Sequence, residues 1–268
     1  MFWTRVASSV VLVILIVGIF FAGPMATGIA MGVVSLIGIN ELLKVYKLEN
    51  TVLGYFSYII NIVYYCLLLF VEGDHTVLCI TVYLLFLLSA YVLTYPKFKD
   101  FDMMGAFLPF IYVGIMLSYI YRIRALENGL VLVFLVFVSS WVNDVFAYLV
   151  GRTIGKHKLS PILSPKKSIE GFFGGIAGAA LFGCIFGAVF NKFVAETDLA
   201  ILKFAVIGAV GALPAVIGDL AASAIKRNHD IKDYGKLIPG HGGIMDRFDS
   251  VIFTAPIVYY LLTLAWGF

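Results

Sequence analysis

Long apolar stretches alternate with short polar connections along almost the whole chain. Nine stretches are each long enough to cross a bilayer as a helix, because about 20 apolar residues at a rise of about 1.5 Å per residue span its hydrocarbon core. Their approximate bounds are 6–22, 25–47, 51–71, 76–95, 103–121, 129–151, 171–190, 200–226 and 250–267. The pattern predicts an all-α, polytopic integral membrane protein with about nine transmembrane helices.

The composition supports a membrane protein and excludes several other classes. Hydrophobic residues make up 62% of the 268 residues and charged residues only 13%, whereas soluble domains are nearer half apolar and a quarter charged. A net charge of +3 gives no reason to expect a nucleic-acid partner. The three cysteines lie inside apolar runs without CxxC spacing, so we expect neither a disulfide framework nor a zinc site.

Basic residues gather beside alternate ends of the predicted helices. Only two connections are long and polar, residues 152–170 and 227–249, and both belong to the side that collects 15 of the 19 lysines and arginines. The positive-inside rule places this side in the cytoplasm. The expected topology therefore has both long loops and the N-terminus inside and the C-terminus outside.

Two aspartates lie within predicted membrane helices, where a charged side chain is costly and often functional. Asp144 stands seven residues before Gly151, and Asp219 stands seven residues before Lys226. At about 1.5 Å per residue, each carboxylate lies roughly 10 Å below a cytoplasmic helix end. The matched depths predict a shared polar cavity that opens toward the cytoplasm.

Further polar residues extend the stripe that begins at Asp219. Ser223, Lys226 and Arg227 follow it at i+4, i+7 and i+8, which is one helical face. Such a face must contact protein or water. An internal ion pair that only fixes helix packing is the alternative. Glu41, in the second apolar stretch, has Lys44 three residues later, and a local ion pair is the expected explanation for it.

The segment of residues 223–250, which includes the second long connection, combines three components that suit a polyphosphate. Residues 223–250 contain five cations, four carboxylates and the stretch Gly240-His241-Gly242-Gly243. Closely spaced glycines let backbone N–H groups approach an anion, while carboxylates hold a metal and cations hold phosphate oxygens. A solvated charged loop is the alternative interpretation.

The same connection carries a long motif that resembles the signature of the phosphatidate cytidylyltransferases, also called CDP-diacylglycerol synthases. The matching residues are Ser223-x-Ile225-Lys226-Arg227-x4-Lys232-Asp233-x-Gly235-x2-Ile238-Pro239-x-His241-Gly242-Gly243-Ile244-x-Asp246-Arg247-Phe248-Asp249. A second segment is similar to the same family: Asp144-x2-Ala147-Tyr148-x2-Gly151-Arg152-x2-Gly155-Lys156, then Ser164-Pro165-Lys166-Lys167-Ser168-x-Glu170-Gly171. Asn143-Asp144-Val145 departs from the Asp-Thr-Gly expected there but keeps Asp144. The resemblance divides one membrane domain into N-terminal helices, residues 1–128, and a catalytic region, residues 129–268.

The resemblance implies a transfer of the cytidylyl group from CTP to phosphatidate, with release of pyrophosphate and a requirement for Mg²⁺. It leaves open a second metal ion. It also implies a homodimer in the bacterial inner membrane, with the active site facing the cytoplasm. The implied metal ligands are Asp219, Asp246 and Asp249. The implied catalytic residues are Asp219, Asp246, Lys226, Arg227 and Lys167. The implied substrate contacts are Ser223, Lys232, His241, Gly242, Gly243, Arg247 and Asp144.

Other functions stay open from the sequence. A related CTP-dependent enzyme, such as a polyprenol kinase or an ether-lipid synthase, would use the same components. A transporter with Asp144 and Asp219 as a cation site is a less favoured alternative, because the chain lacks the internal repeat that is common in transporters. A non-catalytic subunit is disfavoured because the acidic and basic sets are both present.

Overall fold

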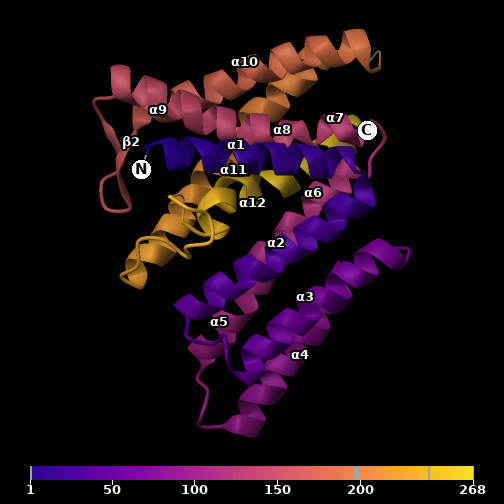
Figure 1. The fold of residues 1–268 in the computed structure, drawn as a ribbon, viewed down its shortest axis with the longest axis vertical. Coiled ribbons are helices and arrows are strands. Elements are labelled where there is room, and N and C mark those ends of the chain that lie inside the picture. The colour runs from indigo at the N-terminus through magenta and orange to yellow at the C-terminus, as the bar shows by residue number, and fades with distance from the viewer. Residues whose placement is uncertain (1, 196–198, 241, 268) are drawn as a thin grey trace. The chain divides into compact units, whose positions relative to one another are not determined.

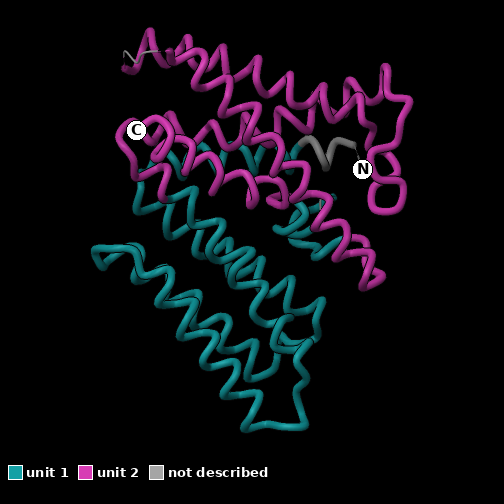
Figure 2. The backbone as a smooth tube through the Cα atoms, turned by 180° about the vertical axis from the view of Figure 1, so that it is seen from behind, with its two compact units in different colours: residues 1–121, 233–246 teal, residues 122–232, 247–268 magenta. Residues whose placement is uncertain are grey.

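The computed structural model describes residues 2–195, 199–240 and 242–267, and most of these residues are helical (Figure 1). The chain forms two compact units (Figure 2). Unit 1 comprises Met1–Tyr121 and Asp233–Asp246, and unit 2 comprises Arg122–Lys232 and Arg247–Phe268. The loop with the Gly-rich stretch therefore belongs to unit 1, together with the N-terminal helices.

Unit 1 is built from antiparallel helices joined by short turns. The helices are α1 (Phe2–Phe21), α2 (Pro24–Val45), α3 (Val52–Phe70), α4 (Thr76–Thr94), α5 (Asp100–Pro109), the π-helical turn η1 (Phe110–Ile115) and α6 (Met116–Arg124), whose last three residues belong to unit 2. Proline at the start of α2 and a Thr51 hydroxyl that accepts from the Gly54 N–H mark two of the helix beginnings, as both residue types commonly do.

Hydroxyl groups connect the helices of unit 1 at membrane depth. The Tyr83 hydroxyl lies 2.5 Å from the Ser57 hydroxyl and donates to the Ala106 carbonyl at 2.8 Å. The Tyr64 and Ser118 hydroxyls lie 2.7 Å apart. Hydrocarbon offers no hydrogen bonds, so polar groups there must find partners within the protein. These pairs therefore stabilise the arrangement of α3, α4, α5 and α6.

Unit 2 contains the remaining helices and one small hairpin. The elements are α7 (Gly129–Leu132), α8 (Phe134–Phe137), the π-helical turn η2 (Val138–Val142), α9 (Asn143–Thr153), the strands β1 (Lys158–Ser160) and β2 (Ser164–Ser168), α10 (Ile169–Phe193), α11 (Ala200–Asn228), α12 (Met245–Tyr260) and the π-helical turn η3 (Leu261–Ala265). The two strands pair antiparallel. The first two residues of α12 belong to unit 1.

Small residues let α10 pack closely against both α9 and α11, which lie beside it (Figure 1). A Cβ at Gly171 would lie 2.6 Å from the Ala147 carbonyl oxygen of α9. A Cβ at Gly183 would overlap the Phe204 carbonyl of α11, and one at Gly208 would overlap the Ala179 carbonyl of α10. Close helix approach through small residues is typical of membrane proteins. Here it holds together the helices that carry Asp144 and Asp219.

The π-helical turn η2, called the wide turn below, interrupts the span Gly129–Thr153 just before Asp144. Its Ser139 hydroxyl donates to the Ile207 carbonyl of α11 at 3.3 Å, and its Ser140 hydroxyl donates to the Val136 carbonyl at 2.7 Å. Both serines are buried. A π turn holds one residue more than an α turn and often stands next to functional residues. Asn143 and Asp144 follow it directly.

The predicted membrane class is confirmed. Among the described residues, eight helices are long and apolar enough to cross a membrane: Pro24–Val45, Val52–Phe70, Thr76–Thr94, Asp100–Arg124, Gly129–Thr153, Ile169–Phe193, Ala200–Asn228 and Met245–Ala265. The first predicted span corresponds to α1, whose apolar part Ala7–Phe21 is shorter. The count of nine and the boundary at residue 128 therefore stay predictions. The hairpin within 152–170 was not predicted.

Candidate active site

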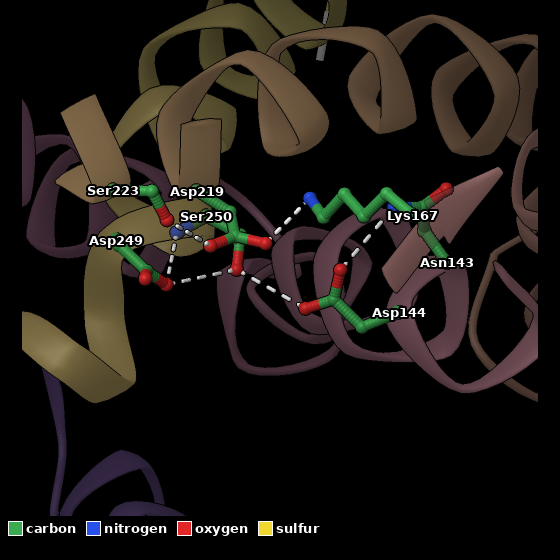
Figure 3. A network of polar contacts seen from close by, with 7 residues as sticks. All are labelled: Asn143, Asp144, Lys167, Asp219, Ser223, Asp249 and Ser250. Carbon is green, nitrogen blue, oxygen red and sulfur yellow. Dashed lines mark hydrogen bonds and ion pairs between the residues drawn. The ribbon is translucent and has the colours of Figure 1, made fainter. Parts of the chain in front are cut away.

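Three aspartates from three helices of unit 2 lie close together (Figure 3): two are joined through Ser250, and the third is paired with a lysine. They are Asp144 of α9, Asp219 of α11 and Asp249 of α12. The Ser250 hydroxyl donates to Asp144 Oδ2 at 3.2 Å and lies 3.4 Å from Asp249 Oδ1. The Lys167 ammonium forms an ion pair of 2.5 Å with Asp219 Oδ2. We call Asp144, Asp219, Asp249 and Lys167 the acidic cluster.

A close approach of α11 and α12 positions two members of the acidic cluster. Gly218 precedes Asp219, and a Cβ at Gly218 would overlap the Asp249 backbone carbonyl and lie 2.9 Å from the Phe253 ring. The Asp249 carboxylate is buried and accepts the Ser250 N–H at 2.8 Å. Glycine at 218 therefore lets the two backbones meet beside the two carboxylates.

The hairpin of β1 and β2 positions Lys167, the cation of the acidic cluster. Lys167 lies in β2, one residue before Ser168, whose hydroxyl accepts the Gly171 N–H at 3.1 Å and caps α10. The side chains of Lys167 and Asp219 are 24% and 31% exposed. Water therefore reaches this ion pair, and such a pair exchanges partners more easily than a fully buried one.

A cavity of about 210 Å³ opens beside the acidic cluster within unit 2. Its lining combines charged residues with an apolar wall. The polar and charged lining residues are Asn143, Asp144, Lys166, Lys167, Ser168 and Asp219, and the remaining ones are Ala147, Tyr148, Leu159, Gly171, Phe172 and Val216. A cavity with both surfaces can take a ligand that has a charged and an apolar part. The side of the membrane to which it opens stays a prediction.

Asn143 adds a polar group that was not among the predicted site residues. It is fully buried, and its Nδ2 lies 3.5 Å from Asp144 Oδ1. Its Oδ1 has no hydrogen-bond partner among the residues that the structure describes. A buried acceptor without a donor is costly, and a Cβ at Gly175 of α10 would overlap this atom, so Asn143 is packed tightly beside the cavity that it helps to line. The signal in the sequence was its place directly before Asp144, where the chain departs from the family pattern.

The donor set of the acidic cluster fits a hard divalent cation such as Mg²⁺. Carboxylate oxygens are its preferred protein ligands, and Mg²⁺ is commonly held by one or two carboxylates together with water and substrate phosphates. Within residues 2–195, 199–240 and 242–267, no three acidic, histidine or cysteine side chains already surround a common point.

The remaining predicted carboxylate, Asp246, lies in unit 1. Its Oδ2 accepts the Tyr234 N–H at 2.8 Å and the Gly243 N–H at 3.0 Å. Gly242 has a positive φ of +87°, a conformation that favours glycine. Because Asp219 belongs to unit 2, a metal ion shared by Asp219 and Asp246 stays a prediction.

Three other predicted site residues lie near the C-terminal end of α11. The Ser223 hydroxyl lies 3.5 Å from Asp219 Oδ1, in agreement with the predicted helical stripe. Lys226 and Arg227 occupy the last turn of the same helix. The roles of Lys226, Arg227, Lys232, Arg247, Gly242 and Gly243 in phosphate binding stay predictions. His241 lies outside the described residues.

Comparison with known proteins decides the family. The sequence pattern of the Cytidylyltransferase family matches residues 3–265, nearly the whole chain. The chain belongs to the cytidylyltransferase family. The resemblance found in the sequence is thereby confirmed, and this membership identifies the chain as an enzyme rather than a transporter or a non-catalytic subunit.

Several bacterial phosphatidate cytidylyltransferases resemble the chain over more than half of its length. A phosphatidate cytidylyltransferase of Bacillus subtilis is 39% identical over 187 residues, 69% of this chain and 68% of that protein. One of Staphylococcus haemolyticus is 40% identical over 176 residues, covering 66% and 65%. One of Thermotoga maritima is 38% identical over 160 residues, covering 59% and 58%. The matched regions therefore span 58% to 68% of the length of these relatives.

Proposed function

We propose that this chain transfers the cytidylyl group of CTP to phosphatidate and releases CDP-diacylglycerol and pyrophosphate. The acidic cluster beside a partly apolar cavity is the observation that supports this proposal most strongly. Three carboxylates and a lysine suit a metal-bound triphosphate, and the apolar wall suits a lipid substrate. The relatives named phosphatidate cytidylyltransferase indicate which lipid to test first.

The reaction is a direct attack of one phosphate on another. An oxygen of the phosphatidate monoester forms a bond to the α-phosphorus of CTP, and the bond from that phosphorus to the bridging oxygen of pyrophosphate breaks. The second pKa of a phosphate monoester is about 6, so the nucleophile is already mostly dianionic at neutral pH. The chain therefore has no need of a strong general base. Its main task is to bring two polyanions together in line.

The acidic cluster supplies the two kinds of charge that this task requires. Asp219 and its predicted partner Asp246 would hold Mg²⁺, with Asp249 as a further proposed ligand and Asp144 beside them. Bound Mg²⁺ would neutralise phosphate charge and polarise the phosphoryl oxygens. Lys167 balances Asp219 in the structure. When the carboxylate takes up a cation, the ammonium would turn to a phosphate oxygen, and its partial exposure leaves room for that change.

The cations after Asp219 would bind the remaining phosphate oxygens. We assign this role to Lys226, Arg227 and Lys232, with Arg247 beside them in sequence. Ser223, His241, Gly242 and Gly243 would add hydrogen bonds to phosphate or ribose. The positive-inside asymmetry supports a site on the cytoplasmic face of the bacterial inner membrane, where CTP is available. A homodimer is the proposed assembly.

The test is an assay of purified protein in detergent with CTP, phosphatidate and Mg²⁺, in which the lipid product is identified by mass. The expected products are CDP-diacylglycerol and pyrophosphate in equal amounts. Polyprenol and ether-lipid phosphates serve as competing substrates, and omission of each component serves as a control. A phosphorylated lipid together with released CDP would instead identify a CTP-dependent kinase and refute the proposal.

A further inference from the structure

A buried carboxylate of unit 1 lies outside the acidic cluster and has no role in the mechanism so far. Glu41, on α2, is only 5% exposed. Its Oε1 accepts the Ile244 N–H at 3.0 Å, and its Oε2 accepts the Met245 N–H at 2.9 Å. The sequence pattern predicted only a local pair with Lys44. The carboxylate instead contacts a segment about 200 positions further along the chain.

The segment of residues 233–246 packs closely around the Glu41 carboxylate. A Cβ at Gly235 would lie 2.5 Å from Glu41 Oε1, and a Cβ at Gly243 would overlap the carboxylate itself. Gly38 lies one helical turn before Glu41, and a Cβ there would lie 3.4 Å from the Met245 sulfur. Two glycines of the signature motif therefore have a structural explanation, because any side chain at these positions would displace Glu41.

A second carboxylate, from within the same segment, accepts hydrogen bonds from its backbone. Asp246 Oδ2 accepts the N–H groups of Tyr234 and Gly243, and the Ile238 N–H donates to the Gly242 carbonyl at 2.8 Å. Glu41 and Asp246 together accept four backbone N–H groups of residues 233–246. The Glu41 contacts fall where α12 begins, and the positive end of a helix dipole favours a negative charge there.

We propose that Glu41 is a positioning residue for the signature loop, residues 233–246. By accepting the N–H groups of Ile244 and Met245, it fixes the backbone directly before Asp246. It thereby sets the position of the neighbouring Gly243 and the direction of the Asp246 carboxylate. Both of its oxygens are needed as acceptors, so an amide at this position is not equivalent. The inference rests on the proposed function, since it assumes that the signature loop takes part in the reaction.

A Glu41→Gln variant tests this role, because it keeps the size of the side chain but directs an NH₂ group at a backbone N–H. The full-length protein in detergent is compared with wild type by kcat and KM for CTP and by hydrogen–deuterium exchange of the whole chain. We expect kcat to fall about 10- to 100-fold, the scale of a small misplacement of reacting groups. Deuterium uptake should rise in peptides from residues 233–246 and stay unchanged in α10 and α11. Glu49→Gln, in the α2–α3 connection of the same unit, should match wild type in both measurements.

Three outcomes would overturn the inference: kcat within twofold of wild type, unchanged uptake in the signature loop, or increased uptake throughout the helices. The last would show a general packing role. If Glu41→Gln does not accumulate as folded protein, Glu41→Asp keeps the charge but shortens the reach, and the same pattern should appear with a smaller change. Failure of the wild type to form CDP-diacylglycerol would refute the proposed function, while the exchange data would still report whether Glu41 holds the loop.

Discussion

Replacement of Asp219 by Asn separates a catalytic role from a structural one. The change keeps the shape of the side chain and removes its charge, so the 2.5 Å ion pair with Lys167 is lost. Both side chains are partly exposed to water, and exposed pairs contribute about 0.2–1 kcal/mol to stability. At about 2–4 °C for each kcal/mol in a chain of roughly this length, Tm should fall by no more than a few degrees.

The expected effect on the reaction is much larger. Loss of one charge-stabilising contact in an active site costs about 10²–10³ in kcat, which corresponds to about 2.7–4 kcal/mol. The rate should therefore fall well beyond what the change in stability explains, and the Mg²⁺ concentration that gives half-maximal rate should rise. The measurements are steady-state kinetics over a Mg²⁺ titration and thermal unfolding in the same detergent.

A second substitution tests whether Lys167 only balances the carboxylate. If it does, Asp219→Asn combined with Lys167→Met should be more active than Asp219→Asn alone, because the unpaired ammonium is removed. We expect no such recovery, since Lys167 is assigned to phosphate binding as well. The reasoning is refuted if Asp219→Asn keeps more than a tenth of the wild-type kcat with an unchanged response to Mg²⁺.

Three further predictions concern the cations, the reaction path and the topology. Arg227→Lys should lower kcat/KM measurably for at least one substrate, because a planar guanidinium holds two phosphate oxygens and an ammonium does not; unchanged kinetics for both substrates would make Arg227 an interfacial anchor. Delipidated enzyme with Mg²⁺, CTP and radiolabelled pyrophosphate should form no labelled CTP, and label at a rate near turnover would reveal a cytidylyl-enzyme and exclude direct transfer. Single cysteines placed within 155–165 or 229–240, in a background without native cysteines, should react only from the cytoplasmic side of sealed vesicles, and labelling from outside at both places would invert the topology.

The hydrophobic pattern was sufficient to locate the membrane helices. The stretch expected at 25–47 is Pro24–Val45, and the one expected at 51–71 is Val52–Phe70. Agreement is close because hydrocarbon admits only segments whose backbone hydrogen bonds are satisfied internally, so length and composition nearly determine the element. Asp144 and Asp219 were found for the same reason, since a carboxylate within such a segment is conspicuous.

Contacts between distant segments were beyond the sequence pattern. Ser250 joins Asp144 to Asp249, but a serine after an aspartate carries no signal of its own. Glu41 was noticed as a charge in an apolar stretch, yet the nearby Lys44 offered a simpler partner than a loop about 200 residues away. Periodicity reports which face of a helix a residue occupies. It does not report which other helix that face meets.

The wide turn η2 has a consequence for how the span that carries Asp144 tolerates change. Each residue of an α-helix advances the side-chain direction by about 100°, and a π turn adds one residue to the count. Loss of a single residue within Val138–Val142 would convert the π turn into an ordinary α turn and leave Asn143 and Asp144 facing nearly the same way. Insertion of one residue into a neighbouring α-helical turn would leave the span long and apolar enough to cross the membrane, yet turn Asn143 and Asp144 by about 100° away from Ser250. Insertion of this span into the bilayer thus depends on its length and hydropathy, whereas assembly of the acidic cluster depends on the direction in which its side chains point. Hydropathy sets the depth of the span, and the number of residues sets the direction in which Asp144 points. The π turn holds one residue to spare, so the direction of Asp144 tolerates a one-residue deletion there better than a one-residue insertion.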